Sequence, residues 1–234
     1  MTKKQLQGSS RTLVAAVLVV IIVVGVAVGA FVLLNNNPVS TASPTSTPSP
    51  TSTPNPTPTP TLTATPTASP TPGDVFSGPR VLLVTSMGNI TLQMRTDMPI
   101  TTGNFLNLTR MGVYDGTIFH RVIEDFMIQG GDPTGTGYGD PRYPNILDEY
   151  TSNNRNLRGT IAMANTGRPN SGSTQWFINT VDNGDRYPGF DSSYPVFGKV
   201  TAGMDVVDAI SKVATSASDK PLQDVTMIKA EVLP

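Results

Sequence analysis

The sequence predicts a mainly β domain, an antiparallel barrel or sandwich, over residues 79–234, preceded by a transmembrane helix and a disordered linker. Short apolar and β-branched runs recur between turn residues in this domain, and only two segments suit a helix. Many short strands with few helices favour an antiparallel barrel or sandwich. The two segments before the domain differ from it in composition, because one is apolar throughout and the other is rich in Pro, Thr and Ser.

The apolar segment is Leu13–Leu34, a run of 22 residues without a charge. As a helix it would span roughly 33 Å, about the thickness of the bilayer hydrocarbon. Basic residues and no acid precede it, so residues 1–12 are expected to be a cytoplasmic tail. A cleaved signal peptide is the alternative, with small residues at Val28-Gly29-Ala30. The run continues past that site, which favours a single-pass anchor in the cell membrane with the folded domain outside the cytoplasm.

Residues 35–78 form the predicted disordered linker. From Pro38 to Gly73 it contains no charge and no aromatic residue, so it cannot bury enough apolar surface to offset the entropy lost on ordering. Frequent proline favours extended polyproline II, with a reach on the order of 100 Å. We interpret it as a spacer, and an O-glycosylated stalk is the alternative.

The folded domain begins with a predicted hairpin and a helix. Val81–Thr85 and Asn89–Met94 alternate as strands do around a turn at Ser86-Met87-Gly88. Pro99 suits the first position of a helix that Gly112 would end. This helix is expected to place three apolar side chains on one face: Ile100, Phe105 and Leu108.

The next predicted strands are Ile118–Ile123 and Phe126–Gln129, joined by a tight acidic turn at Glu124-Asp125. Gly130–Gly139 is too rich in glycine to be regular, and Asp182–Ser193 also resembles a loop. The remaining expected elements are strands at Thr160–Ala164, Gln175–Thr180, Val196–Val200 and Val225–Val232, and a short helix at Met204–Ile210.

Composition excludes several classes of site. There is no cysteine, so disulfides, thiolate nucleophiles and Cys-ligated metals are absent. From Arg80 onward 13 basic residues face 16 acidic ones without a basic patch, so we expect no nucleic-acid partner. His120 is the only histidine and is interpreted as a hydrogen-bonded core residue rather than part of a catalytic triad. Asp182–Asp185 is interpreted as a turn, and we expect no metal and no cofactor.

A peptide-binding pocket is the remaining hypothesis. An apolar floor could be formed by Phe126, Met127 and Phe177, although Met127 and Phe177 could equally be plain core. Directed polar groups could come from Arg121, Gln129, Asn165 and Gln175. Few polar groups in an apolar pocket suit an extended peptide better than a charged metabolite. Arg121 is either a salt-bridged structural residue or a strong donor in that pocket.

Five blocks of the domain resemble the cyclophilins. They are Phe119–Ile123, Phe126–Asp132, Gly159–Asn165, Ser173–Asn179 and Val196–Val200, in the order and spacing of the family. The resemblance runs from about Arg80 to Pro234 and implies an eight-stranded antiparallel barrel capped by two helices. It also implies peptidyl-prolyl cis-trans isomerase activity.

The resemblance also implies the roles of individual residues. Arg121 resembles the catalytic arginine, and Gln129 the residue that positions Arg121 and the substrate. The pocket for the proline ring would comprise Phe126, Met127 and Phe177, completed by Phe190 and Tyr194. The groove for the residues before the proline would comprise Ala164, Asn165 and Gln175.

Two departures from the family pattern stand near this predicted site. The turn after Ile123 is the acid pair Glu124-Asp125, which could weaken the field of Arg121 or tether it. The tryptophan that many relatives carry shortly before the Phe190 position is absent, and Trp176 should face the opposite side of its strand from Phe177. We therefore expect weak binding of cyclosporin, a ligand of the family.

The sequence as a whole predicts a membrane-anchored isomerase that acts on X-Pro bonds of exported or cell-surface proteins and assists their folding. The expected partners are proline-containing peptides and unfolded proteins, together with the membrane through Leu13–Leu34, and we expect a monomer. A module that binds proline-containing peptides without turnover is the alternative. Retention of Arg121 with Phe126 and Gln129 favours the enzyme.

Overall fold

The structure is a computed structural model that describes residues 74–234. The predicted cytoplasmic tail, transmembrane anchor and most of the linker therefore lie outside the described residues. Within residues 74–234, no helix is both long enough and apolar enough to cross a membrane.

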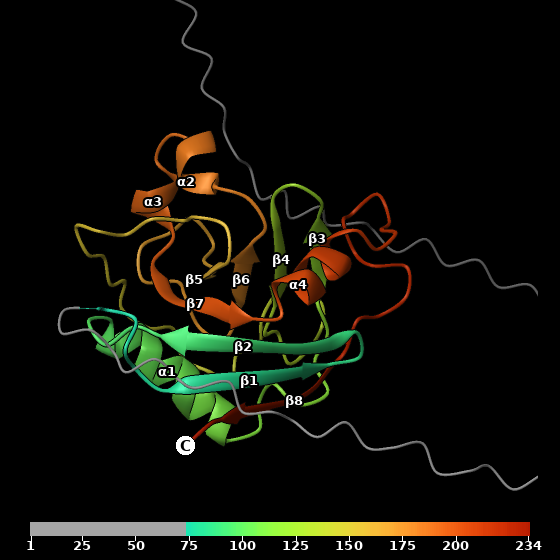
Figure 1. The fold of residues 1–234 in the computed structure, drawn as a ribbon, viewed down its shortest axis with the longest axis horizontal. Coiled ribbons are helices and arrows are strands. Elements are labelled where there is room, and N and C mark those ends of the chain that lie inside the picture. Colours follow the sequence, from blue (N-terminus) through green and yellow to red (C-terminus); the bar gives the residue numbers. More distant parts are fainter. Residues whose placement is uncertain (1–73) are drawn as a thin grey trace, which may run out of the picture. The chain divides into compact units, whose positions relative to one another are not determined.

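The described chain forms one eight-stranded antiparallel sheet that curls around its core (Figure 1). The order of the strands across the sheet is β3-β4-β6-β5-β7-β2-β1-β8. The predicted mainly β class and the number of strands are confirmed. The strands are β1 Arg80–Thr85, β2 Gly88–Met94, β3 Arg121–Ile123, β4 Met127–Gly130, β5 Thr160–Met163, β6 Trp176–Asn179, β7 Val196–Ala202 and β8 Met227–Val232.

The two edge strands of the sheet are linked by the segment that leads into β3. Gly116 N donates to Met227 O (2.7 Å), and Met227 N donates to Thr117 O (2.7 Å). Phe119 N then donates to Val225 O (3.0 Å). These bonds satisfy backbone groups that an open sheet would leave exposed at its edges. The predicted strands at 118–123 and 225–232 are shorter than expected because their outer residues form this irregular closure.

Two longer helices pack against the sheet, as predicted: α1 Pro99–Arg110 and α4 Met204–Ser211 (Figure 1). Phe105 and Leu108 of α1 are buried as expected, but Ile100 is 41% exposed, so its placement on the buried face was wrong. Thr101 and Thr102 are buried there instead. The first free N–H groups of α1 are capped from a distant loop, because the Glu149 carboxylate accepts from Ile100 N and Thr101 N.

The segment Asp182–Ser193 is more regular than the loop predicted for it. It contains two single-turn helices, α2 Asn183–Arg186 and α3 Phe190–Ser193, which lie together at one end of the molecule (Figure 1). Asn183 joins this segment to the sheet, because its side-chain amide donates to Phe126 O (2.7 Å) and to Asn179 Oδ1 (2.7 Å).

The apolar side chains form two separate clusters. The inner core contains Trp176, fully buried, whose ring lies edge-on to Phe105, Tyr114 and Phe119. The second cluster, called here the outer cluster, comprises Met127, Ala162, Phe177, Phe190 and Val196. Trp176 and Phe177 thus lie in different clusters, which confirms that they face opposite sides of β6.

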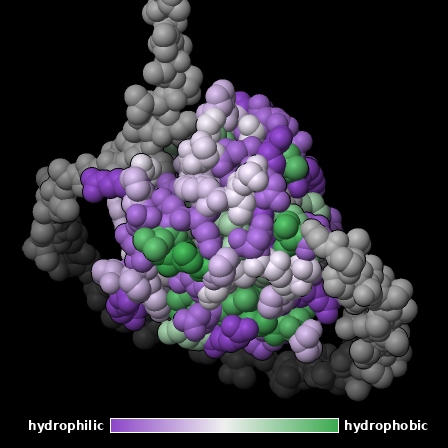
Figure 2. Space-filling model, turned by 90° about the vertical axis from the view of Figure 1, so that its left-hand side faces the viewer, coloured by the Kyte–Doolittle hydropathy of each residue, from purple (hydrophilic) through white to green (hydrophobic). Residues whose placement is uncertain are grey.

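The surface shown in Figure 2 is largely hydrophilic, with apolar residues gathered in small separate patches. Scattered apolar residues are normal on a soluble domain surface. Large apolar side chains that are exposed in the described region include Met111, Tyr138, Leu147 and Leu222.

Candidate active site

The β3–β4 hairpin carries four of the predicted site residues, Arg121, Met127 and Gln129 on its strands and Phe126 in its turn. Arg121 of β3 lies opposite Gln129 of β4, and Ile123 lies opposite Met127. Because strand side chains alternate between faces, these four share one face, while Val122 and Ile128 enter the inner core. The predicted acidic turn is present, and Asp125 adopts a left-handed conformation (φ 54°) that Asp tolerates better than most residues.

Neighbouring strands extend this face into a row across the sheet. Gln129 lies opposite Phe177 of β6, and Phe177 lies opposite Ala162 of β5. Arg121, Gln129, Phe177 and Ala162 are therefore successive members of one cross-strand row. The row places a guanidinium, an amide and an aromatic ring next to one another, although they are far apart in the sequence.

The rings of four residues pack together at the outer cluster and are called here the aromatic assembly: Phe126, Phe177, Phe190 and Tyr194. Phe190 lies at the centre, with ring centroids 5.8 Å from Phe126, 6.0 Å from Phe177 and 4.6 Å from Tyr194. Tyr194 also lies edge-on to Phe177 at 5.4 Å. All the residues predicted to bind the proline ring are therefore brought together: Phe126, Met127, Phe177, Phe190 and Tyr194. Phe126 and Tyr194 are only partly buried, so the assembly reaches the surface.

Side-chain amides continue the site toward a glycine-rich loop. Gln129 Nε2 donates to Gln175 Oε1 (2.9 Å), and Gln175 Nε2 donates to Gly137 O (3.1 Å). The loop itself is organised by the buried Asp132, which accepts from the backbone N–H groups of Gly137 (2.7 Å) and Gly139 (3.2 Å). Gln129 was expected to position Arg121 and the substrate, and this stays a prediction. Within the described residues the Gln129 side chain makes no hydrogen bond to Arg121, and its Nε2 donates to Gln175.

Hydrogen bonds determine the ionisation of Asp132. Burial acts to raise the pKa of its carboxyl group, but hydrogen bonds from Thr134, Gly139 and Gly137 outweigh burial and lower the pKa. The carboxylate therefore stays charged and acts as an acceptor for the loop beside Gln175.

Asn165 and Ala164 lie beyond the end of β5, near the start of β6. Ala164 N donates to Gln175 O (3.1 Å), which places it beside the hydrogen-bonded side chains of Gln129 and Gln175. Asn165 Nδ2 donates to Ser193 O (2.8 Å), which connects it to the end of α3. Ala164 is thus hydrogen-bonded to Gln175, and Asn165 to the last residue of α3, which directly precedes Tyr194.

Arg121 has one acidic partner within the described residues. Its Nε lies 3.4 Å from Oδ2 of Asp219, and the two side chains are 36% and 41% exposed. The sequence pointed to Glu124 and Asp125, but neither forms an ion pair with Arg121. The backbone carbonyl of Asp125 accepts from Arg186 instead. Arg121 is therefore salt-bridged, and its role as a donor in an apolar pocket stays a prediction.

His120 is buried, as predicted, and within the described residues no hydrogen bond of standard geometry reaches either ring nitrogen. Burial lowers the pKa of His120, although the charge of Asp132 and the side-chain amide of Gln175 both act to raise it. Hydrogen bonding of His120 therefore stays a prediction. The neutral imidazole has no acidic or nucleophilic partner, and within residues 74–234 no group of three or more metal-binding side chains is present.

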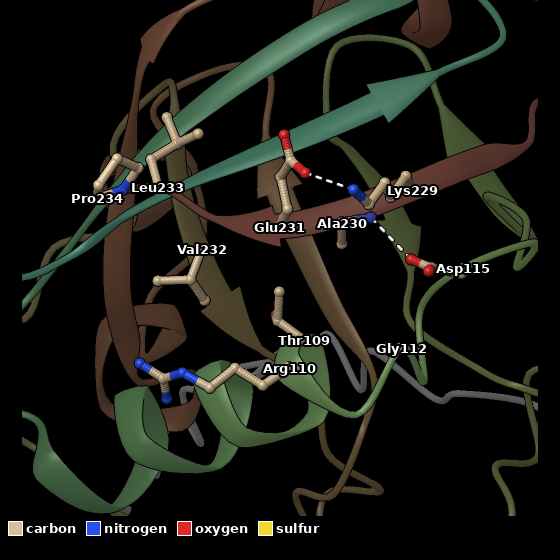
Figure 3. Close-up of a pocket in the computed structure, with 10 residues that line it drawn as sticks. All are labelled: Thr109, Arg110, Gly112, Asp115, Lys229, Ala230, Glu231, Val232, Leu233 and Pro234. Atoms are coloured by element: carbon tan, nitrogen blue, oxygen red, sulfur yellow. Dashed lines mark hydrogen bonds and ion pairs between the residues drawn. The ribbon is translucent and has the colours of Figure 1, made fainter.

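Two hollows lie away from the aromatic assembly. One, of about 480 Å³, lies between the end of α1 and β8, where Lys229 pairs with Glu231 and Asp115 Oδ1 accepts from Ala230 N (2.9 Å; Figure 3). Another, of about 460 Å³, lies beside the outer edge of β3 and includes Asp219. Neither hollow contains a residue of the aromatic assembly.

Comparison with known proteins identifies the family. Residues 80–232 match the family described as cyclophilin type peptidyl-prolyl cis-trans isomerase/CLD. The chain belongs to the cyclophilin family. It is 38% identical over 163 residues to the peptidyl-prolyl cis-trans isomerase CYP18-2 of Arabidopsis thaliana, covering 67% of this chain and 95% of that protein. It is 40% identical over 157 residues to the isomerase ppi1 of Schizosaccharomyces pombe, covering 65% of this chain and 98% of that one.

Solved structures agree with this assignment. A cyclophilin type isomerase of Cryptosporidium parvum matches with a TM-score of 0.61 and 30% identity, covering 67% of this chain and 98% of its own. The same protein crystallised in the presence of the dipeptide Ala-Pro matches with the same score and identity, covering 66% of this chain and 99% of its own. The chain described in this structure is therefore a peptidyl-prolyl cis-trans isomerase, and proline-containing peptides are its substrates.

Sequence reasoning missed two residues of this cyclophilin site. Tyr187 lies edge-on to Phe126 at 5.4 Å and adds a ring to the rim of the aromatic assembly. Asp219 reaches Arg121 from 98 positions further along the chain. Tyr187 lies in a segment read as a loop, and Asp219 has no local pattern that would connect it with a strand so distant in sequence.

Proposed function

We propose that Arg121 is the catalytic donor of this isomerase and that the aromatic assembly holds the proline ring of the substrate. The observation that carries the proposal is the cross-strand row, which sets Arg121 and Gln129 beside Phe177. A donor with a permanent charge thus lies next to the surface that suits a proline ring.

The reaction requires no nucleophile, metal or cofactor. The barrier to rotation of a peptide bond, about 18–20 kcal/mol, comes from amide resonance, and no covalent bond changes in the course of the rotation. A hydrogen bond donated toward the prolyl nitrogen favours its pyramidal, single-bonded form. Arg121 suits this role because its guanidinium is always protonated and carries several donors in a rigid plane.

The aromatic assembly assists by holding one side of the rotating bond. With the proline ring packed among Phe126, Phe177 and Phe190, the segment before the proline turns. An environment poor in water also increases the strength of each hydrogen bond to the twisted amide. Asn165 and Gln175 would bind the backbone of the residues before the proline.

The natural substrates are proposed to be exported or cell-surface proteins that are still unfolded. The support for this is the sequence before the domain, an apolar run of bilayer length followed by a Pro/Thr/Ser-rich spacer. Uncatalysed isomerisation takes tens to hundreds of seconds, slow enough to limit folding. A monomer on such an anchor would assist folding near the outer face of the membrane.

The catalytic role is tested by measuring isomerisation of a short X-Pro peptide with the parent chain and with Arg121→Ala. We expect a loss of transition-state stabilisation of about 2–4 kcal/mol in the variant, seen mainly in kcat. Arg110→Ala, which removes an arginine from the end of α1, is the control. Equal activity of parent and Arg121→Ala would overturn the assigned role.

The proposed location is tested separately by fractionating cells that express the full chain and adding protease to intact cells. Membrane association with digestion of the folded domain is expected. A chain recovered in the soluble fraction and protected from the protease would refute the anchor.

A further inference from the structure

We propose that Asp219 is a positioning residue for Arg121, which fixes the orientation of the guanidinium from its Nε edge. This inference rests on the proposed catalytic role of Arg121. The side-chain oxygen Oδ2 of Asp219 lies 3.4 Å from Nε of Arg121, and within residues 74–234 no other carboxylate lies within ion-pair distance of that guanidinium.

The backbone of Asp219 is fixed to the strand that carries Arg121. Val122 N donates to Asp219 O (2.8 Å), a bond to the residue directly after Arg121. Asp219 lies in a turn that backbone hydrogen bonds stabilise. Asp219 N donates to Ser216 O (3.0 Å), and Ser216 N donates to Lys220 O (2.8 Å). The carboxylate therefore has a defined position relative to β3 even though 98 residues separate the two partners.

The conformation of Asp219 restricts which residues can stand there. Its φ of 62° is one of three positive values among non-glycine residues in the described chain. Asp, Asn and Gly tolerate this region better than residues with bulkier side chains. A side chain is thus kept at a position where glycine would meet no backbone strain, and the interaction with Arg121 gives a reason for it.

The way in which Asp219 contacts the guanidinium leaves the reacting side of Arg121 free. The carboxylate contacts Nε, and within the described residues neither Nη group of Arg121 makes a hydrogen bond. The two Nη groups remain available for the prolyl nitrogen and for the preceding carbonyl oxygen. Because both side chains are more than a third exposed, the ion pair contributes little to stability, and its effect is expected in the orientation of Arg121.

An oriented guanidinium accelerates the chemical step rather than binding. An arginine side chain has several rotatable bonds, so an unrestrained guanidinium spends part of its time away from the rotating amide. The substrate is held chiefly by the aromatic assembly, which Asp219 does not touch. Loss of Asp219 should therefore lower kcat and leave KM nearly unchanged.

The test compares Asp219→Gly, Asp219→Asn and Asp224→Ala in the full chain, with kcat and KM measured on one X-Pro peptide. Glycine suits the positive φ, so Asp219→Gly is expected to fold, and to lose about 3- to 10-fold in kcat with KM within about 2-fold. Asparagine keeps an acceptor oxygen and tolerates the same φ, so Asp219→Asn should retain kcat within about 2-fold. Asp224→Ala removes a carboxylate of the same loop that lies 3.9 Å from Lys220, and should resemble the parent.

The same substitutions in an Arg121→Ala background separate this inference from the proposed function. If Asp219 acts through Arg121, Asp219→Gly causes no further loss once Arg121 is absent. A parent-like kcat for Asp219→Gly, an equal loss in Asp219→Asn, or an additional loss in the double variant would each overturn the inference. Full activity of Arg121→Ala alone would instead overturn the proposed catalytic role.

Discussion

Replacement of Phe190 by alanine tests whether the outer cluster stabilises the fold in addition to its proposed role as the proline site. Phe190 is 7% exposed, and its ring packs against four other aromatic rings at centroid distances from 4.6 to 6.0 Å. Removing a buried Phe side chain costs about 3–5 kcal/mol of unfolding free energy. Because α3 is a single turn of four residues that can partly relax, we expect a value near the lower limit, about 3 kcal/mol.

Urea unfolding of the full chain measures this loss. Trp176 is the only tryptophan and is fully buried in the inner core, so its fluorescence reports global unfolding without a direct contribution from the substituted ring. With an m-value of about 2 kcal/mol/M, a loss of 3 kcal/mol moves the midpoint by about 1.5 M. Leu222→Ala, at a position 67% exposed, is the control and should shift the midpoint little.

The kinetic consequence should accompany the loss of stability. At a urea concentration where the variant is still folded, KM for an X-Pro peptide should rise because the proposed proline site loses its central ring. Phe190→Leu, which keeps most of the volume, should lose only about 1 kcal/mol and retain activity. A midpoint shift below about 0.5 M for Phe190→Ala would refute the argument, since it would mean that the rings are not packed in solution.

Two other perturbations test the surroundings of the site. Gly131 has φ 80°, and an added Cβ would lie 2.6 Å from both Thr174 O and Trp176 Nε1, so Gly131→Ala should lose about 3 kcal/mol or more in the same urea assay. Gly167→Ala, with φ 78° and open space around it, should lose only about 1 kcal/mol. Burial lowers the pKa of His120, so below about pH 6.5 the unfolded chain binds a proton that the folded chain does not. The free energy of unfolding should therefore decrease as the pH is lowered below about 6.5, by up to about 1.4 kcal/mol per pH unit. His120→Gln should remove this part of the pH dependence, and an unchanged slope between pH 7 and pH 5 would contradict it.

The regular elements were predictable from the sequence because their signals are local. Alternation placed the β1–β2 hairpin within one residue of its observed limits, and Pro99 correctly marked the start of α1. The same alternation separated Trp176 from Phe177. Each of these conclusions depends on neighbours within a few residues of one another, which is the range over which periodicity carries information.

The parts that sequence reasoning missed depend on contacts between distant residues. The N-terminus of α1 has no local side-chain cap, and Glu149 caps it from a loop about fifty positions away. The pairing of Arg121 with Asp219 arises only because a turned loop lies against the edge of β3. The sequence offered Glu124 and Asp125 instead, since nearness in sequence was the only guide available.

The two faces of β3, β4 and β6 should respond to different substitutions, because one face forms the inner core and the other carries the proposed site. In β3, β4 and β6, alternate residues enter the inner core, among them Val122, Ile128 and Ile178. Their intervening neighbours, such as Arg121 and Gln129, form the cross-strand row. A change on the first face alters packing in a closed interior, whereas a change at the polar positions of the second alters a network that is partly exposed. The geometry of that network depends on two loops and on the end of α3 as well as on the sheet, because Gly137, Asp219 and Ser193 each contact a residue of the site. We therefore expect the geometry of the proposed site to be more sensitive to substitutions in these segments than the sheet that supports it.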